Sequence, residues 1–241
     1  ALITAGSAVC AQDLSTFLAA PPAPGAWASY RIETSWPGRT KRERFNLAVT
    51  GSEEIDGQPR LWIEAWPTDF ARYKGGVMRL LLKASPSSEE ALNPFLQASA
   101  LAYQEPCQEA FKLSSGALSF MHGQAKNIKV DQKKTDMAPE SATSTKGVTF
   151  ECSRVQISTT TESNLFGRSI KMTETGVYWF SDRTPFRLVK AQIERVQVQK
   201  GKEDRRRTIT VTLREGAATG ASSQFSKPVT REKGLLGLLF N

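Results

Sequence analysis

The sequence predicts a mainly β (α+β) protein built around an antiparallel sheet. Apolar and polar residues alternate along segments such as 25–36 and 207–213, with the period of two that a half-buried strand shows. Turn-forming residues such as Pro37-Gly38 separate these segments. A further segment, residues 177–180, holds only β-forming residues, which predicts a strand with apolar neighbours on both faces.

The predicted order of elements is a short helix, a meander, a helical insertion and a second meander. The predicted strands are residues 25–36, 45–49, 61–66, 77–82, 148–157, 169–180, 188–198 and 207–213. The short helix covers residues 13–20, because Asp13 can cap it and Pro21 ends it. The main helix is predicted to begin at Asn93, with Pro94 in its first turn and an inward face that extends to Tyr103.

Several segments between the strands have less regular patterns. Residues 107–124 fit a strand or a short helix equally well, and the polar residues 131–146 predict an exposed loop. Residues 216–226 are rich in Gly, Ala and Ser, which predicts a flexible linker before the leucine-rich tip at 234–240. That tip docks on the protein itself, docks on a partner, or is a frayed end. The apolar parity changes along 188–198, which predicts a β-bulge there.

The charge balance and the N-terminal residues bear on location. The net charge of +8 favours contact with lipid headgroups, lipopolysaccharide or nucleic acid, or else it only aids solubility. Residues 1–11 resemble the end of an export signal cleaved after Ala11, which predicts a periplasmic protein of a Gram-negative-type bacterium. Acylation of Cys10, or an N-terminus that is no signal, are the alternatives. No later segment reaches the roughly 20 apolar residues that span a bilayer.

Two cysteines remain when Cys10 is set aside. Cys107 and Cys152 form an even pair, and in an oxidising compartment such a pair is expected to form a disulfide. The alternative is two unpaired, buried thiols.

The segment 176–194 reads GVYWFSDRTPFRLVKAQIE, which predicts two strands joined by a turn that ends at Pro185. It resembles a stretch of periplasmic lipoprotein carriers of the LolA/LolB type, where a Trp-containing strand precedes an acidic turn, a proline and a Phe-x-Leu-Val-Lys strand. The resemblance implies a strongly curved antiparallel half-barrel sheet whose concave face is covered by helices. It also implies one domain over residues 12–215, with a signal remnant at 1–11 and a C-terminal tail at 216–241. The long segment 131–146 departs from the compact carriers of that family.

The chain shows little sign of catalytic chemistry. His122 has no acid or nucleophile at a recognisable spacing, and no nucleophile elbow, zinc helix or phosphate-binding loop occurs. The acidic turn at Glu53, Glu54 and Asp56 lacks the spacing of a calcium loop. We therefore expect no enzyme activity, no cofactor and no metal.

Two sets of side chains are candidate binding residues. An apolar set is predicted to line a hydrophobic groove, or else to be ordinary core, and consists of Trp62, Trp66, Leu80, Leu82, Tyr178 and Phe180. A basic set surrounds two predicted turns and consists of Arg39, Arg42, Lys200, Lys202, Arg205, Arg206 and Arg207. These cations hold anionic headgroups in one interpretation, and only protect sheet edges in the other. No aromatic residue lies within 200–207, which speaks against nucleic acid as the partner.

These observations favour a non-enzymatic periplasmic carrier or binding protein for a lipid, lipoprotein or other hydrophobic ligand. We expect it to be a monomer that makes at most peripheral membrane contact. The alternative is an envelope interaction protein that uses the C-terminal tail to contact a membrane-protein partner. A secreted hydrolase is disfavoured for want of a nucleophile and base.

Overall fold

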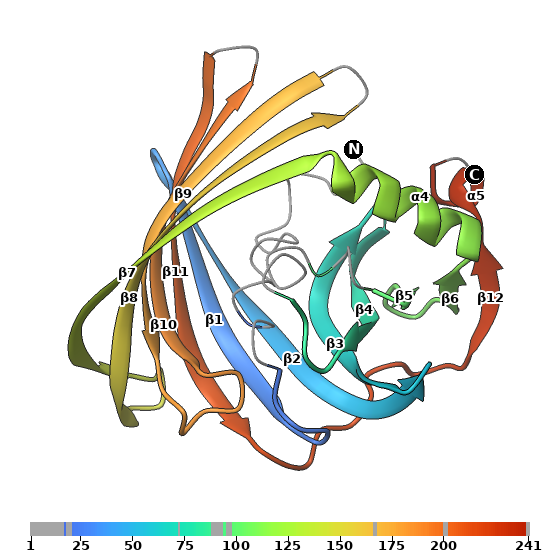
Figure 1. Cartoon of the computed structure of the whole chain (residues 1–241). Helices are drawn as coiled ribbons and strands as arrows, with labels where there is room; N and C mark the ends of the chain where they lie inside the picture. The colour runs from blue at the N-terminus through green and yellow to red at the C-terminus, as the bar shows by residue number, and fades with distance from the viewer. Residues whose placement is uncertain are drawn as a thin grey trace. The chain divides into compact units, whose positions relative to one another are not determined.

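A computed structural model describes residues 17, 21–71, 73–87, 94, 98–165, 168–199 and 202–239 of the chain. The elements are, in chain order, β1 (Trp27–Trp36), β2 (Arg39–Ile55), β3 (Gln58–Phe70), β4 (Tyr73–Lys83), β5 (Ala100–Gln104), β6 (Ala110–Leu113), α4 (Ser115–Lys126), β7 (Ile128–Thr143), β8 (Thr149–Leu165), β9 (Arg168–Phe180), β10 (Leu188–Gln199), β11 (Lys202–Ala217), β12 (Val229–Lys233) and α5 (Leu235–Leu239) (Figure 1). The prediction of a mainly β fold is confirmed.

The strands form one 12-stranded sheet in the order β12-β6-β5-β4-β3-β2-β1-β11-β10-β9-β8-β7. Strands β2 to β6 pair antiparallel with their chain neighbours, and so do β7 to β11. Strand β12 pairs parallel with β6, so the last strand of the chain lies beside one from its middle. The chain divides into two compact units: a first unit of residues 1–28, 45–125 and 217–241, and a second of 29–44 and 126–216.

The strand-turn-strand predicted for residues 176–194 is confirmed. Strand β9 ends at Phe180 and β10 begins at Leu188, and these two residues are paired in the antiparallel register. The turn between them is closed by the backbone, because Ser181 N donates to Arg187 O at 2.8 Å.

Three other predictions need correction or lie outside the described residues. Residues 131–143 are not a loop, since they belong to β7, whose backbone pairs with β8, and only residues 144–146 of the predicted loop lie in the turn that follows. The side chains of β7 are mostly exposed, which is why its sequence looks like a loop. The helix predicted to extend to Tyr103 is also wrong, because residues 100–104 form β5 against β4. Most of the two predicted helices lies outside the described residues, although Phe17 is helical.

The first unit has a core of aromatic rings on one face of its strands. We call this the aromatic face, and it carries Leu80, Tyr103 and Phe111. The ring of Tyr73 lies 5.9 Å from that of Tyr103 and 5.0 Å from that of Phe111. The opposite face carries Glu64 in place of an apolar residue, and we call it the strap face.

A tyrosine hydroxyl bridges β3 and β4 by hydrogen bonds where their pairing is interrupted. The register of these strands shifts between Ala65 and Thr68, and Tyr103 from β5 inserts its hydroxyl at this point. The hydroxyl donates to Thr68 O at 2.7 Å and accepts from Gly76 N at 3.1 Å. Burial raises the pKa of Tyr103, so the hydroxyl keeps its proton and stays a donor. Gly76 has no side chain at this crossing, and the hydroxyl occupies that space.

Around residues 177–180 the sheet of the second unit is apolar on both faces, as this run of β-forming residues predicts. Tyr178 and Trp179 are adjacent in β9, lie on opposite faces and are both buried. Trp179 belongs to a separate cluster with Ala142, Cys152 and Val189. Both faces of this strand are therefore filled by side chains.

An ion pair is buried in the second unit. Arg195 of β10 and Glu174 of β9 are opposite in register, and their side chains are 1% and 9% exposed. Arg195 continues the buried row of Ala191 and Ile193, which explains the parity change seen in the sequence. The predicted bulge lies shortly after Arg195 in the same strand, because the register of β10 with β11 shifts between Gln197 and Val198.

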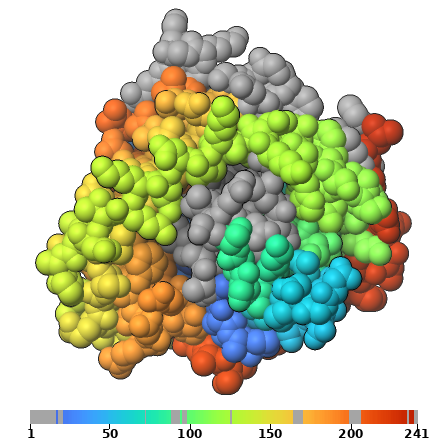
Figure 2. Space-filling model, viewed as in Figure 1, coloured from blue at the N-terminus to red at the C-terminus, as the bar shows by residue number. Residues whose placement is uncertain are grey.

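Two described helices accompany the sheet. Helix α4 lies beside the C-terminal residues of the first unit (Figures 1 and 2), where Ser114 N donates to Lys233 O at 3.0 Å. The predicted arrangement of helices over a concave face is not seen in the described residues. No described helix has the length and apolar character needed to cross a membrane.

Candidate functional site

The site lies in the first unit and begins with a buried carboxylate. Glu64 on the strap face has no exposed surface. Its oxygens accept hydrogen bonds from Ser223 Oγ at 2.6 Å and from Gln224 N at 2.7 Å. The guanidinium of Arg79 lies 3.6 Å from the same carboxylate, which offsets part of the cost of burying its charge.

These bonds fix the segment that the sequence predicts to be a flexible linker. We call residues 221–239 the C-terminal strap. Beyond Gln224, the backbone of Ser226 donates to Gln104 Oε1 at 3.0 Å, and Gln104 Nε2 donates to Ser226 Oγ at 3.0 Å. The strap then adds β12 to the edge of β6. The linker prediction therefore does not describe residues 221–226, because buried polar groups of β3 and β5 bind their backbone.

The end of the strap packs on the protein's own first unit. Leu238 of α5 is 2% exposed, and Tyr73 Oη donates to Gly237 O at 3.2 Å. Leu236 is 71% exposed on the same short helix. Of the possibilities left open for the leucine-rich tip, the structure shows docking on the chain itself.

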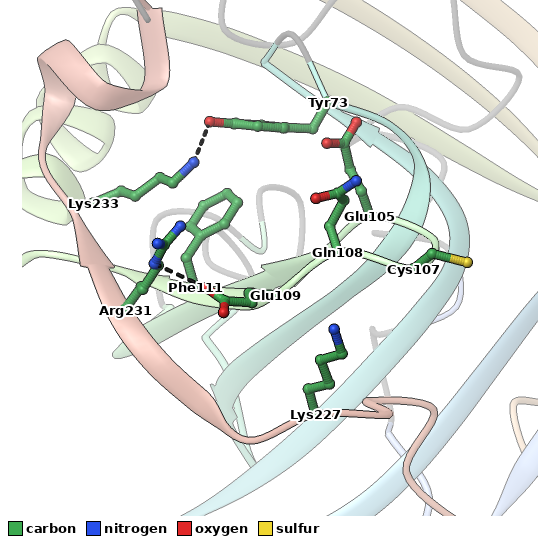
Figure 3. A pocket seen from close by; sticks show the side chains of 9 residues that line it. All are labelled: Tyr73, Glu105, Cys107, Gln108, Glu109, Phe111, Lys227, Arg231 and Lys233. Atoms are coloured by element: carbon green, nitrogen blue, oxygen red, sulfur yellow. Dashed lines mark hydrogen bonds and ion pairs between the residues drawn. The ribbon is translucent and has the colours of Figure 1, made fainter.

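A pocket of about 520 Å³ lies where the strap meets β4, the β5–β6 turn and β6. This volume falls within the range of small-molecule sites. Its lining residues are Tyr73, Glu105, Cys107, Gln108, Glu109, Phe111, Lys227, Arg231 and Lys233 (Figure 3). All three cations come from the strap, and both carboxylates come from the opposite wall.

An ammonium group held on aromatic rings forms one side of the pocket. Lys233 Nζ lies 4.6 Å from the ring centre of Tyr73 and 4.5 Å from that of Phe111. It also donates to Tyr73 Oη at 2.6 Å (Figure 3). Cation–π attraction and this hydrogen bond fix its position, and an ammonium has two further N–H donors to offer a ligand.

The other charges of the pocket are partly paired. Arg231 Nε lies 2.9 Å from Glu109 Oε2, and Glu105 Oε1 accepts from Lys74 N at 3.0 Å. Lys227 extends into the space below Gln108 and Glu109 (Figure 3). With three cations and two carboxylates, the pocket favours an anion.

The predicted groove residues are not brought together on one surface. Leu80 and Leu82 point to the aromatic face and are buried, whereas Trp62 and Trp66 lie on the strap face. Trp62 is covered by Arg79, whose guanidinium lies 4.5 Å from its ring centre. Tyr178 and Phe180 belong to the second unit, where their rings stack at 6.1 Å. The hydrophobic groove stays a prediction.

The predicted basic residues belong to the second unit, and those with described side chains do not line the pocket. Arg42 Nε lies 2.6 Å from Glu33 Oε2, and this hydrogen bond raises the pKa of Arg42. Arg39 stacks on Trp36, and Arg206 pairs with Glu194 at 2.8 Å. The remaining members of the predicted basic set are located by backbone position, except Lys200. Arg207 lies opposite Arg195 in the register of β10 and β11, the backbones of Lys202 and Arg205 lie in β11, and Lys200 lies outside the described residues.

The predicted disulfide between Cys107 and Cys152 is wrong, because both cysteines are free thiols. Cys152 is buried in the cluster around Trp179, which the sequence could not reveal. Cys107 lies in the exposed β5–β6 turn, with its sulfur pointing away from the cations of the pocket (Figure 3).

The two thiols should differ sharply in reactivity. In the native protein we expect iodoacetamide to modify Cys107 readily, whereas Cys152 reacts only after unfolding. Burial raises the pKa of Cys152, which lowers its thiolate fraction in addition to blocking access. Mass spectrometry of the native and unfolded protein checks this. A mass gain of two hydrogens upon reduction would show instead that the two cysteines form a disulfide.

His122 gives no sign of a catalytic role. Its Nε2 lies 3.0 Å from Ala98 O, so it links α4 to the residues before β5. Within the described residues, no group of three or more acidic, histidine or cysteine side chains could hold a metal ion.

Sequence reasoning missed the residues that make the site. Glu64 is a lone acid in the apolar run of β3, and that was an available signal for a buried partner. Lys227, Arg231 and Lys233 are spread over a tail without a pattern, and nothing in the sequence places them opposite Tyr73.

Comparison with known proteins gives a loose structural likeness. No family model matches the sequence, and no curated protein matches it. One similar solved structure is of a protein from Bacteroides fragilis described as exported, with a YmcC-like fold (13% identity, TM-score 0.39). Another is of a protein from Parabacteroides distasonis described as a lipoprotein (15% identity, TM-score 0.42). Each likeness covers 82% of this chain and 97% of the other.

Solved structures similar to the chain also include a LolA superfamily protein from Nitrosomonas europaea. Its identity is 11%, its TM-score is 0.26, and the likeness covers 87% of this chain and 93% of that one. None of the three TM-scores reaches 0.5, so no ligand or activity is carried over from these proteins.

Proposed function

We propose that this protein is a non-enzymatic binding protein of the periplasm for an amphipathic, anionic ligand, such as a lipid or the lipid part of a lipoprotein. The pocket of the first unit receives the anionic headgroup. The observation that carries this proposal is the Lys233 ammonium held on the rings of Tyr73 and Phe111, in a pocket with an excess of positive charge.

The polar and apolar parts of the ligand have different support. The pocket geometry supports the proposed headgroup contacts, since charge-assisted hydrogen bonds from lysine and arginine suit phosphate and carboxylate groups. The acyl part rests on the predicted hydrophobic groove, and the periplasmic location rests on residues 1–11, which lie outside the described residues. The alternative, an interaction protein that uses its tail as the contact, has less support because the strap is bonded to the first unit.

Vesicle binding tests the proposal. We expect the protein to bind vesicles of phosphatidylcholine with phosphatidylglycerol, and to bind vesicles of phosphatidylcholine alone much more weakly. Lys233→Met and Lys227→Met should each weaken binding roughly tenfold, which is the loss of one charge-assisted contact. A parallel titration with glycerol phosphate by calorimetry tells whether a free phosphate ester suffices or a lipid is needed.

The matched control is Lys112→Met. Lys112 is in β6 next to Phe111, pairs with Glu232 at 3.4 Å and does not line the pocket. The Lys112→Met substitution also removes one positive charge from the first unit, and it should leave vesicle binding unchanged. Equal losses in all three variants would show that only net charge matters, and would refute the pocket as the headgroup site.

A further inference from the structure

We infer that Glu64, which lies outside the pocket, is a positioning residue for ligand binding, and that the ligand and the strap stabilise each other in the docked state. This inference rests on the proposed function, because it assumes that the pocket takes an anionic ligand. It adds a regulatory role to a residue on the other face of β3.

The pocket has two walls that come from separate parts of the chain. The strap provides the three cations, and β4 to β6 with their turns provide the rings and the carboxylates. A ligand that contacts both walls binds fully only when the strap is docked. Binding therefore favours the docked state, and docking favours binding by the same factor.

Polar contacts hold the strap between the sheet and the pocket. Its side chains from Ser222 to Glu232 are exposed or half-buried, so polar contacts hold this stretch, whereas Leu238 provides apolar burial at the end of the strap. The buried anchor is Glu64, which binds Ser223 and Gln224 only three residues before Lys227. Release of the strap would cost the buried carboxylate both hydrogen bonds. Because these bonds hold the strap so close to Lys227, Glu64 positions the first pocket cation.

The charges of the strap explain why an anionic ligand stabilises its docked state. Docking brings Lys227, Arg231 and Lys233 around one pocket, where like charges repel each other. Glu109 offsets part of this repulsion through Arg231. An anion in the pocket offsets more of it, so a docked strap with a bound anion is the most stable combination.

Hydrogen exchange of the strap amides tests the coupling. The amides of Gln224 and Ser226 report strap release, since they donate to Glu64 and Gln104. With phosphatidylglycerol vesicles at 100 times the dissociation constant, we expect their exchange to slow by about 100-fold. An arm with saturating glycerol phosphate separates the headgroup from the lipid, and the Gly57 turn of the β2–β3 hairpin should show no change in either arm.

Variants of the anchor provide the second measurement. Ser223→Ala should speed the exchange of both amides roughly tenfold without ligand, because it removes a hydrogen bond to a buried carboxylate. Glu64→Gln should do the same, and saturating vesicles should reverse both effects. Ser222→Ala makes the same change one residue earlier, without the bond to Glu64, and should leave exchange unchanged. Ser223→Thr restores the hydroxyl and should restore slow exchange.

Different failures have different meanings. If the vesicles bind, and Lys233→Met abolishes binding, but the exchange of Gln224 and Ser226 does not respond, the coupling is refuted and the proposed function stands. If the wild-type protein binds neither vesicles nor glycerol phosphate, both are refuted. If Ser222→Ala and Ser223→Ala speed exchange equally, Glu64 is not the anchor and the inference is wrong.

Discussion

Replacing Glu174 by leucine should lower the free energy of unfolding by about 3–5 kcal/mol, because the charge of Arg195 is then buried without its partner. Arg195 is 1% exposed and cannot turn to solvent within the sheet. The double variant Glu174→Leu/Arg195→Met buries no charge, and we expect it to recover most or all of the loss. Urea denaturation of the wild type and these two variants measures these differences.

A matched control lies on the neighbouring strand. Glu194 pairs with Arg206 at 2.8 Å, but these side chains are 52% and 59% exposed. Glu194→Leu should cost about 1 kcal/mol or less, because solvent screens such a pair. If Glu194→Leu and Glu174→Leu cost the same, or if the double variant is no more stable than Glu174→Leu, the buried pair has no special role.

Adding one methyl group at Gly76 should destabilise the first unit by about 1–3 kcal/mol or more. A Cβ at this position would lie 2.3 Å from Gln104 O and 2.7 Å from the hydroxyl end of Tyr103. The carbonyl oxygen belongs to the backbone of β5 and cannot move alone. Gly76→Ala must therefore shift β4 from β5 or expel the tyrosine hydroxyl from its position between Thr68 and Gly76.

The chain offers an opposite control for the same substitution. Gly123 lies within α4, and nothing would be within 4 Å of an added Cβ. Gly123→Ala should raise the stability by about 1 kcal/mol, because alanine is the better helix former. Thermal unfolding of both variants measures the contrast. A melting temperature for Gly76→Ala at or above that of the wild type would contradict the described packing.

The sequence predicted the elements that show a strong local pattern. The strand pair in 176–194 and the two-sided burial of Tyr178 and Trp179 were visible, because a run of β-formers and a proline turn are local signals. Strand β7 was missed because backbone pairing with β8 holds it, and backbone pairing leaves no apolar pattern in the side chains.

The candidate site was largely hidden for a different reason. Its parts come from β3, from the β5–β6 turn and from a tail more than 100 residues later, as the bond of Gln104 to Ser226 shows. Such a site depends on which distant segments meet, and single-sequence patterns describe only neighbours. Trp62 and Leu80 were predicted to line one groove, whereas the structure places them on opposite faces of the sheet.

The parallel pairing of β12 with β6 has a consequence for the order in which the molecule is completed. A chain that is synthesised or exported from its N-terminus presents β3 to β6 long before the strap follows. During that interval the edge of β6 lacks its neighbour, the pocket has none of its cations, and the Glu64 carboxylate has no strap to bind. Under the proposed function, ligand capture has to wait until the strap has emerged and docked.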